Sequence, residues 1–177
     1  MIRFREHNAE VLYAEDPIVQ VDREDIEFLV GRAAKNPRKR VRLCAHKNVD
    51  DNLHEMLIVH ARDCYVRPHK HLSKSESFHI IRGVVDIVLL DETGHIIEVV
   101  PMGEYGTGRK FFYRLADPYY HTLLIHSDYV IFHEITNGPF NRADTIFAPW
   151  APAETDAATV ESFMKELARS VEHWNRT

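Results

Sequence analysis

The sequence has few cysteines, and none are paired in a metal-binding or redox spacing. Only Cys44 and Cys64 occur among 177 residues, and no CxxC pair exists. Zinc ribbons and thioredoxin-like redox motifs use such pairs, so the sequence gives no sign of either class. We expect both thiols to be reduced and buried as small apolar side chains, in preference to forming a disulfide or binding a metal.

Long apolar segments are missing as well. A membrane-spanning helix needs roughly 18 or more consecutive apolar residues, and no stretch of this chain approaches that length. The N-terminal stretch MIRFREHNAE carries charges where a signal peptide needs an apolar segment. We therefore expect a cytoplasmic protein with no membrane partner.

An excess of positive charge is also absent, whereas histidine is abundant. The chain has 22 Lys and Arg against 27 Asp and Glu, which gives a net charge of −5. General nucleic-acid binders normally present a basic surface, so we expect no nucleic-acid partner. The chain contains 12 histidines, and this excess indicates either metal or proton chemistry or a chance accumulation of histidine on the surface.

The chain divides into three parts of one domain. Residues 1–39 are expected to form an N-terminal extension, in which residues 2–21 are either one or two edge strands or a loosely ordered arm. A short amphipathic helix follows, with Asp22 as N-cap, and ends near Asn36. Residues 40–152 are expected to form a β-barrel. Residues 153–177 form an amphipathic helix capped at Thr155, whose apolar stripe packs on this domain or on a second copy.

The central part consists of short aromatic and β-branched runs separated by turn signals. Their regular recurrence is typical of an antiparallel sandwich or barrel. The run LLDETGHIIEVV predicts a hairpin in which Gly94 takes the positive-φ position.

The stretch PHKHLSKSESFHIIRG carries the clearest candidate site. Side chains alternate between faces along a strand, so His69 and His71 point the same way with roughly 6.5 to 7 Å between their Cα atoms. Glu76 lies in register with Phe78 and Ile80, which would face inward. Two imidazoles and a carboxylate suit an open iron, zinc or manganese site. The alternative is a solvated turn in which Glu76 pairs with a lysine.

The spacing His69-x-His71-x4-Glu76-x6-Gly83 resembles the first motif of the cupins. The runs RVRLCAH, DDNLHEMLI, RPHKHLSKSESFHIIRG, FYR, VIFHEITNGPF and DTIFAPWAP closely resemble the WbuC family of cupin-fold metalloproteins, over roughly residues 18–152. The resemblance implies a mainly β fold, a cupin-type antiparallel double-stranded β-helix or jelly-roll barrel. It also implies a single-barrel metal-binding protein, often encoded among O-antigen or other polysaccharide genes.

A fourth ligand is implied by the second cupin motif. His121 in PYYHTLL follows an aspartate-proline turn and begins a strand, so it is the best candidate, with His133 and His54 as rivals. The chain departs from the family's pattern at Asp63, Ala116, Pro118 and Ile125. We expect one divalent metal ion, and the ligand types do not choose among Fe, Mn, Zn, Ni and Co.

Further polar residues interrupt the apolar strands. We expect acid/base roles for His133, Glu134 and His54, and substrate contacts from Arg42, His46, Tyr113 and Arg114. The alternatives are a hydrogen-bonded core histidine, an exposed edge arginine and aromatic packing. The basic residues Arg67, Lys70, Lys74, Arg109, Lys110 and Arg114 could form a positive mouth suited to a phosphorylated or nucleotide-linked sugar, and the alternative is a solvated rim.

Four functional hypotheses remain open at this point. The first is a metal-dependent isomerase or epimerase acting on a sugar or sugar nucleotide in polysaccharide (O-antigen) biosynthesis. The second is a non-catalytic cupin that binds a metabolite through its metal, and the third is an Fe(II) oxygen-dependent enzyme. The fourth uses His69 or His121 as a plain acid/base residue. The expected partners are a small-molecule substrate, with an anionic sugar as the candidate class, and a second copy of the chain paired through the terminal strand and helix.

Overall fold

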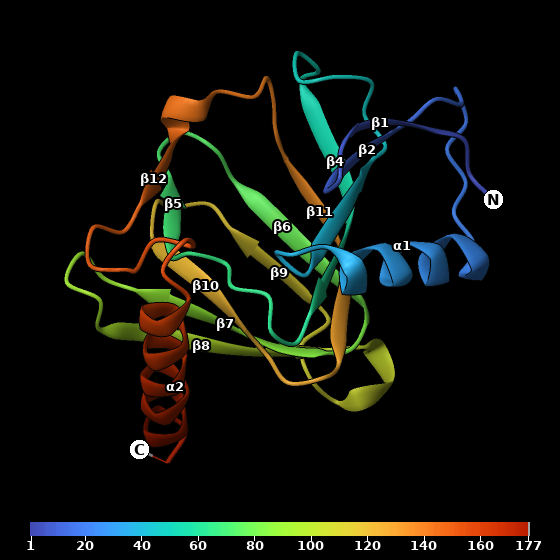
Figure 1. Cartoon of the computed structure of the whole chain (residues 1–177). Helices are drawn as coiled ribbons and strands as arrows, with labels where there is room; N and C mark the ends of the chain where they lie inside the picture. Colours follow the sequence, from blue (N-terminus) through green and yellow to red (C-terminus); the bar gives the residue numbers. More distant parts are fainter. Residues whose placement is uncertain (177) are drawn as a thin grey trace.

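Two β-sheets face each other and a helix flanks each of them (Figure 1). The computed structural model describes residues 1–176. Sheet A has seven strands in the order β1-β2-β3-β4-β11-β6-β9, and sheet B has five in the order β12-β5-β10-β7-β8. The elements are β1 (Phe4–Asn8), β2 (Val11–Ala14), α1 (Arg23–Lys35), β3 (Arg40–Cys44), β4 (Leu53–Ala61), β5 (His69–His71), β6 (Glu76–Arg82), β7 (Val84–Leu90), β8 (Ile96–Gly103), η1 (Tyr105–Thr107), β9 (Phe112–Leu115), β10 (Tyr120–Ile125), β11 (Tyr129–Asn137), η2 (Arg142–Asp144), β12 (Thr145–Phe147) and α2 (Ala157–Trp174).

The strand order is that of a jelly roll. From β4 to β11 the chain crosses repeatedly between the sheets, so that β4-β11-β6-β9 in sheet A faces β5-β10-β7-β8 in sheet B. All pairings among these eight strands are antiparallel. Two interlocked Greek keys of this kind make the double-sheet jelly roll of the cupins. The expected fold class, with its short N-terminal helix and C-terminal amphipathic helix, is confirmed.

The space between the sheets is filled by alternate residues of each strand. On β6, Phe78 and Ile80 are buried in this core while His79 and Ile81 are exposed on the other face. Because side chains alternate along a strand, the same period places Glu76 on the inner face with Phe78. The inner faces therefore carry both the apolar core and the candidate site.

Helix α1 covers part of the outer face of sheet A. Its N-cap is Asp22, whose side chain accepts hydrogen bonds from the backbone N–H groups of Glu24 and Asp25, and its C-cap is Asn36. Both ends match the prediction from sequence. Leu29 and Ala33 of the helix pack with the outward side chains of β3, β4 and β11. The N-terminal residues form two strands, and β2 joins sheet A parallel to β3.

Helix α2 packs on the outer face of sheet B. Leu167 and Val171 lie in one buried cluster with Val88 and Leu90 of β7, so the apolar stripe of the helix contacts its own domain. The N-cap is Asp156, and the prediction of Thr155 is wrong by one residue. Asp156 forms the cap because its carboxylate accepts from both the N–H and the hydroxyl of Thr159. Neither helix within residues 1–176 is long and apolar enough to cross a membrane.

Two glycines hold the turns that flank β7. Gly94 has φ of 91° in the β7–β8 hairpin, as predicted. Gly83 has φ of 97°, and a Cβ atom there would lie 2.4 Å from the carbonyl oxygen of Tyr129. Any larger residue at position 83 would be strained in backbone conformation and would also clash.

The two cysteines are free and buried. Burial raises the pKa of Cys44 to about 11 and that of Cys64 to about 12. Thiols with these properties are poor nucleophiles, because the thiolate is the reactive form. The prediction of reduced, buried side chains is confirmed.

His60 gives the fold a testable dependence on pH. It is buried on the inner face of β4, with its Nδ1 unpaired among the described residues, and burial with the charges of Arg40 and Arg42 lowers its pKa to about 3. Between the unfolded pKa of about 6.5 and the folded value, only the unfolded chain takes up the proton, so stability falls as pH falls. One such group gives a slope of about 1.4 kcal/mol per pH unit.

We predict that His60→Leu flattens the dependence of the free energy of unfolding on pH between about pH 4 and pH 6. Urea unfolding followed by circular dichroism at several pH values measures this slope. The matched control is His79→Leu, at an exposed position on β6, which should retain the wild-type slope. Equal slopes for His60→Leu and wild type would contradict the assignment.

Candidate metal centre

Three histidines from two neighbouring strands of sheet B form a cluster. His69 and His71 lie on β5, and His121 lies on β10 directly opposite His69. One ring nitrogen from each lies within 4.8 Å of the other two. The centroid of the His69 ring is 5.1 Å from that of His71 and 4.4 Å from that of His121. These three side chains could hold a metal ion.

Each ring is oriented by a contact at its outer nitrogen. The Nδ1 atoms of His69 and His121 lie 2.9 Å and 3.2 Å from the carbonyl oxygens of Arg67 and Tyr119. The Nδ1 atom of His71 lies 3.2 Å from the hydroxyl of Thr145 on β12. A carbonyl only accepts hydrogen bonds, so the neutral rings of His69 and His121 carry the proton on Nδ1 and leave the Nε2 lone pair free. Metal-binding histidines are typically oriented in this way.

Glu76 approaches the cluster from the opposite sheet. Its Oε1 atom lies 3.0 Å from Nε2 of His121, and its Oε2 atom lies 3.6 Å from Nε2 of His71. The side chain is 4% exposed, and Oε1 has no partner of hydrogen-bond geometry within residues 1–176. A buried carboxylate oxygen without a hydrogen bond is costly unless another group compensates it. This carboxylate therefore lies beside the three-histidine cluster, whose nitrogens are close enough together to hold a metal ion.

The charges of the cluster are strongly coupled. Burial lowers the pKa of His69 to about 3, so this imidazole is neutral at pH 7. Burial is the largest influence on Glu76 and would raise its pKa, but His121, His71 and His69 together hold it well below the usual range. For His121, Glu76 overcomes the effect of burial and raises the pKa. An ionised Glu76 and a neutral His69 are the forms that bind metal.

Polar side chains continue from Glu76 across the inner face of sheet A. In the strand register Glu76 lies opposite Thr136, and Thr136 lies opposite His54. The next inward row of the sheet contains Tyr113 and Glu134. Nε2 of His54 and the hydroxyl of Tyr113 are buried without a hydrogen-bond partner in the described chain. Burial and the charge of Glu76 raise the pKa of Tyr113, which therefore remains a hydrogen-bond donor. We refer to these inward polar side chains and the histidine cluster as the polar chamber.

Glu134 and His133 point in opposite directions from β11. In the strand register Glu134 lies opposite Phe78 and Met56. Both of these side chains belong to the inner core, so Glu134 faces the polar chamber. Burial and the nearby charge of Glu76 raise the pKa of Glu134 to about 8. His133 is paired with His79 on the outer face, and its Nε2 lies 3.9 Å from Glu55. The expected acid/base role of His133 does not fit this position.

His54 and His46 form a separate pair beside the chamber. Their rings are stacked with centroids 4.1 Å apart and an interplanar angle of 1°. His46 is held through Nδ1 by the backbone of Glu55, and burial lowers the pKa of both histidines. Neither belongs to the three-histidine cluster, so the structure brings His121 to His69 and His71 in preference to the rivals His54 and His133.

Arg42 and Arg114, both expected to contact substrate, lie on different sides of sheet A. Arg42 is exposed and pairs with Ile58, whose side chain belongs to the inner core, so Arg42 lies at the open flank of the inner face. Arg114 follows Tyr113 on β9 and therefore points outward, where it donates to the hydroxyl of Ser75 at 3.3 Å. The substrate role predicted for Arg114 is inconsistent with this orientation.

The structure favours a solvated rim over a positive mouth, because members of the basic group make separate contacts. Arg67 donates to the carbonyl oxygens of Ala148 and Ala151, Lys70 pairs with Glu92, and Arg109 lies 3.6 Å from Asp86 on the outer face of sheet B. Lys70 lies on β5, whereas Arg67 and Arg109 lie in the segments before β5 and before β9, and their contacts are in different parts of the molecule. No single basic rim results from them.

Thr145 and the backbone of Arg67 are elements of the cluster that sequence reasoning missed. Thr145 begins β12, whose pairing with β5 brings its hydroxyl to His71 across 74 residues of sequence. A threonine in the run DTIFAPW carries no spacing relationship to the histidine motif. Only the strand pairing reveals it.

Comparison with known proteins gives partial matches. A family described as a domain of unknown function (DUF6016) matches residues 21–102, which are 82 of the 177 residues. No curated protein matches the chain. Three similar solved structures, each with a TM-score of 0.47, are a protein from Shewanella oneidensis (10% identity, 58% of this chain and 66% of that chain), a mutant oxalate decarboxylase from Bacillus subtilis (15%, 61% and 27%) and the capsular polysaccharide assembling protein CapF from Staphylococcus aureus (16%, 61% and 31%).

The chain thus spans about two thirds of the Shewanella protein and less than a third of the other two chains. At these identities the likeness concerns the fold. The jelly-roll assignment rests on the strand order given above.

We predict that His69→Ala and His121→Ala abolish stoichiometric binding of divalent metal, because each removes a donor from a buried set. Elemental analysis of protein purified without an affinity tag, after loading and desalting, measures the metal content. His79→Ala, an exposed histidine on the opposite face of β6, should bind as much metal as wild type. Undiminished metal in folded His69→Ala would place the metal elsewhere.

Thr145→Val tests the outer contact of His71. The change removes the hydroxyl near Nδ1 and nearly preserves the side-chain volume. Loss of such an orienting group typically weakens metal affinity about 10- to 100-fold. Competition with a chromophoric chelator measures this change, and an affinity equal to that of wild type would show that Thr145 does not orient the ring.

Proposed function

We propose that this chain is a WbuC-type cupin-fold metalloprotein that holds one divalent ion with His69, His71, His121 and Glu76. One observation carries the proposal: three oriented imidazoles form a cluster that could hold an ion, and the buried carboxylate of Glu76 lies beside them, with Oε1 3.0 Å from Nε2 of His121. Imidazole and carboxylate ligands suit Fe, Mn, Zn, Ni and Co alike. We also propose that the chain binds a single ion and that His121 is the fourth ligand.

The ligand of this centre is proposed to be a small polar metabolite, with an anionic sugar or sugar nucleotide as the preferred class. Two features support this. The buried hydroxyl of Tyr113 lacks a partner among the described residues and can donate to a polar ligand. Arg42, exposed at the flank of the same inner face, offers a charge for a carboxylate or phosphate.

The proposed reaction is isomerisation or epimerisation of such a sugar in polysaccharide biosynthesis, in the cytoplasm. A bound divalent ion would supply Lewis-acid polarisation of a carbonyl oxygen. Glu134 faces the chamber, where its carboxyl can hold or deliver a proton. Tyr113 can donate a hydrogen bond to a substrate oxygen.

We predict that Glu134→Gln retains metal but lowers turnover about 10²- to 10⁴-fold, the range typical for a general acid or base. Keto sugars and sugar nucleotides are first screened by thermal shift of the metal-loaded protein, and the hits are followed by NMR for changes at their stereocentres. Glu55→Gln, on the outer face, is the control and should leave turnover unchanged.

Two outcomes argue against the reaction. Glu134→Gln with wild-type turnover would remove Glu134 from the chemistry. Metal-loaded protein that binds sugars without converting them would favour the non-catalytic metabolite-binding protein instead, and oxygen consumption by the Fe(II) form would favour an oxygen-dependent enzyme.

Arg42→Ala should weaken binding of an anionic hit about 10- to 100-fold, because a charged hydrogen bond contributes about 1.5–3 kcal/mol. Isothermal titration of the metal-loaded protein measures the change. Arg62→Ala provides the control, since Arg62 pairs with Asp128 at an exposed position. Equal weakening by both variants would indicate a general charge effect and no specific contact.

A further inference from the structure

An exposed arginine without a polar partner lies close to the histidine cluster. Arg142 belongs to η2, directly before β12, and its Cζ atom lies 5.1 Å from the centroid of the Phe147 ring. Within residues 1–176 its guanidinium group makes no hydrogen bond or ion pair. A guanidinium group at this distance from an aromatic ring is attracted to its face. The ring therefore holds Arg142 while its N–H donors remain free.

Phe147 connects this arginine to the metal centre. In the strand register of β12 and β5, Phe147 lies opposite His69 and Thr145 lies opposite His71. Residues directly opposite each other project to the same face of a sheet, so Phe147 shares the inner face with the histidines. The centroids of the Phe147 and His69 rings are 6.1 Å apart. Because β12 is the edge strand of sheet B, the Phe147 ring lies where the inner face ends.

A second guanidinium group stacks on the same ring. The Cζ atom of Arg67 also lies 5.1 Å from the Phe147 centroid. Nη2 of Arg67 donates to the carbonyl oxygens of Ala148 and Ala151, which fixes the side chain, and its Nε is buried without a partner in the described chain. No carboxylate of residues 1–176 forms an ion pair with either arginine. We call Arg67, Arg142 and Phe147 the arginine platform.

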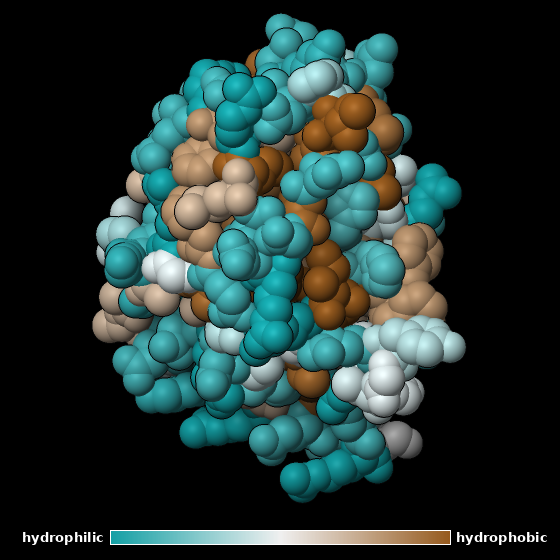
Figure 2. Space-filling model, turned by 90° about the vertical axis from the view of Figure 1, so that its right-hand side faces the viewer, coloured by the Kyte–Doolittle hydropathy of each residue, from teal (hydrophilic) through white to brown (hydrophobic). Residues whose placement is uncertain are grey.

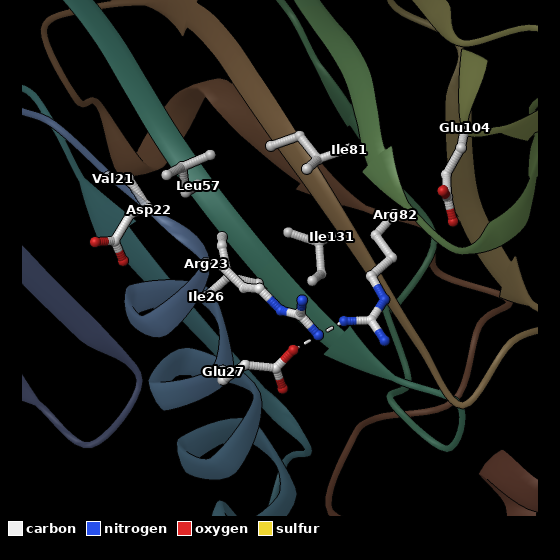
Figure 3. A pocket seen from close by; sticks show the side chains of 10 residues that line it. All are labelled: Val21, Asp22, Arg23, Ile26, Glu27, Leu57, Ile81, Arg82, Glu104 and Ile131. Carbon is white, nitrogen blue, oxygen red and sulfur yellow. Dashed lines mark hydrogen bonds and ion pairs between the residues drawn. The ribbon is translucent and has the colours of Figure 1, made fainter. Parts of the chain in front are cut away.

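The arginines of the groove beside α1 are in a different electrostatic environment. This groove, about 560 Å³ on the outer face of sheet A, holds Arg23 and Arg82 together with Asp22, Glu27 and Glu104 (Figure 3). Arg82 is paired with Glu27 at an N–O distance of 3.0 Å. Carboxylates outnumber guanidinium groups there, so the groove does not suit an anion. Figure 2, which shows the side that lies to the right in Figure 1, displays hydrophilic side chains around a broken apolar band.

We propose that the arginine platform binds the phosphate group of a phosphorylated metabolite whose other end reaches the metal centre, and that Arg142 determines the preference for phosphate. The inference rests on the proposed function, because it assumes that the ligand binds at the metal. A phosphate monoester has three terminal oxygens and up to two negative charges, which match two guanidinium groups better than a carboxylate does. A guanidinium group held by stacking also loses less freedom when it binds an oxyanion.

A matched pair of probes tests the phosphate preference. D-Glycerate offers an α-hydroxy acid to the metal, and 3-phospho-D-glycerate adds a phosphate group at the other end. In calorimetric titrations of wild-type protein loaded with Mn²⁺, we expect 3-phosphoglycerate to bind about 10- to 100-fold more tightly than glycerate, as for charged hydrogen bonds. Arg142→Gln should remove this gain and leave the affinity for glycerate unchanged, whereas Arg142→Lys, which keeps the charge without the planar group, should restore only part of it.

The matched control is Arg169→Gln, an exposed arginine on α2 at the outer face of sheet B. It should retain the full gain from the phosphate group. A loss as large as that of Arg142→Gln would indicate a general effect of net charge and would overturn the proposal. Wild-type protein that binds both probes equally would overturn it as well. Circular dichroism verifies that each variant is folded.

Inorganic phosphate and metal-free protein separate this proposal from the metal centre. Phosphate should shift the side-chain Nε–H signals of Arg67 and Arg142 in ¹H–¹⁵N NMR spectra, and Arg142→Gln should weaken this binding about 10-fold or more. This result in a protein that takes up no metal would support the platform and contradict the proposed metal centre. Metal-dependent binding of glycerate, with no phosphate effect on either arginine signal, would contradict the platform alone.

Discussion

The structure depends on how it compensates one buried carboxylate. Glu76 occupies an inward position on β6 that is otherwise apolar, and it is 4% exposed. An unpaired charge there would cost several kcal/mol, so the fold must bring partners to it. The partners come from the opposite sheet: His121 on β10 and His71 on β5, with His69 beside them. The site is therefore also a contact between the two sheets.

The jelly roll explains how these groups converge. Because the chain crosses from sheet to sheet between β4 and β11, β5 and β6 are consecutive in sequence yet lie in opposite sheets. The loop between them turns His69, His71 and Glu76 toward one another. β10 then lies beside β5 and adds His121. Outer contacts from β12 and from the segment before β5 set the orientation of the rings.

Sequence reasoning succeeded where a single strand carries the information. The period of two placed His69 with His71 and put Glu76 in the row of Phe78, and the resemblance to cupins supplied the fold. Sequence reasoning could not decide whether His133 or Glu134 points inward, because β11 is buried on both faces. Ile131 packs beneath α1 while Phe132 packs between the sheets, so the run YVIFHEI shows no alternation that marks the inner side.

Positions that depend on strand pairing could not be predicted from the sequence either. Arg67, Lys70 and Arg109 are close to the site strands in sequence, but the faces and sheets of those strands separate them. Thr145 shows the reverse case, since β12 delivers it to His71 from far along the chain. Local spacing therefore predicts a motif, whereas the second sheet and the outer contacts require the fold.

The central claim is that the imidazoles and Glu76 share one metal ion. X-ray absorption spectroscopy of metal-loaded protein, purified without a histidine tag, tests it most directly. The account predicts one tightly bound ion per chain, with multiple-scattering features of imidazole and a first shell of nitrogen and oxygen at about 2.0–2.2 Å if the ion is zinc. A spectrum without imidazole scattering, or folded protein that retains no metal after loading, would contradict it.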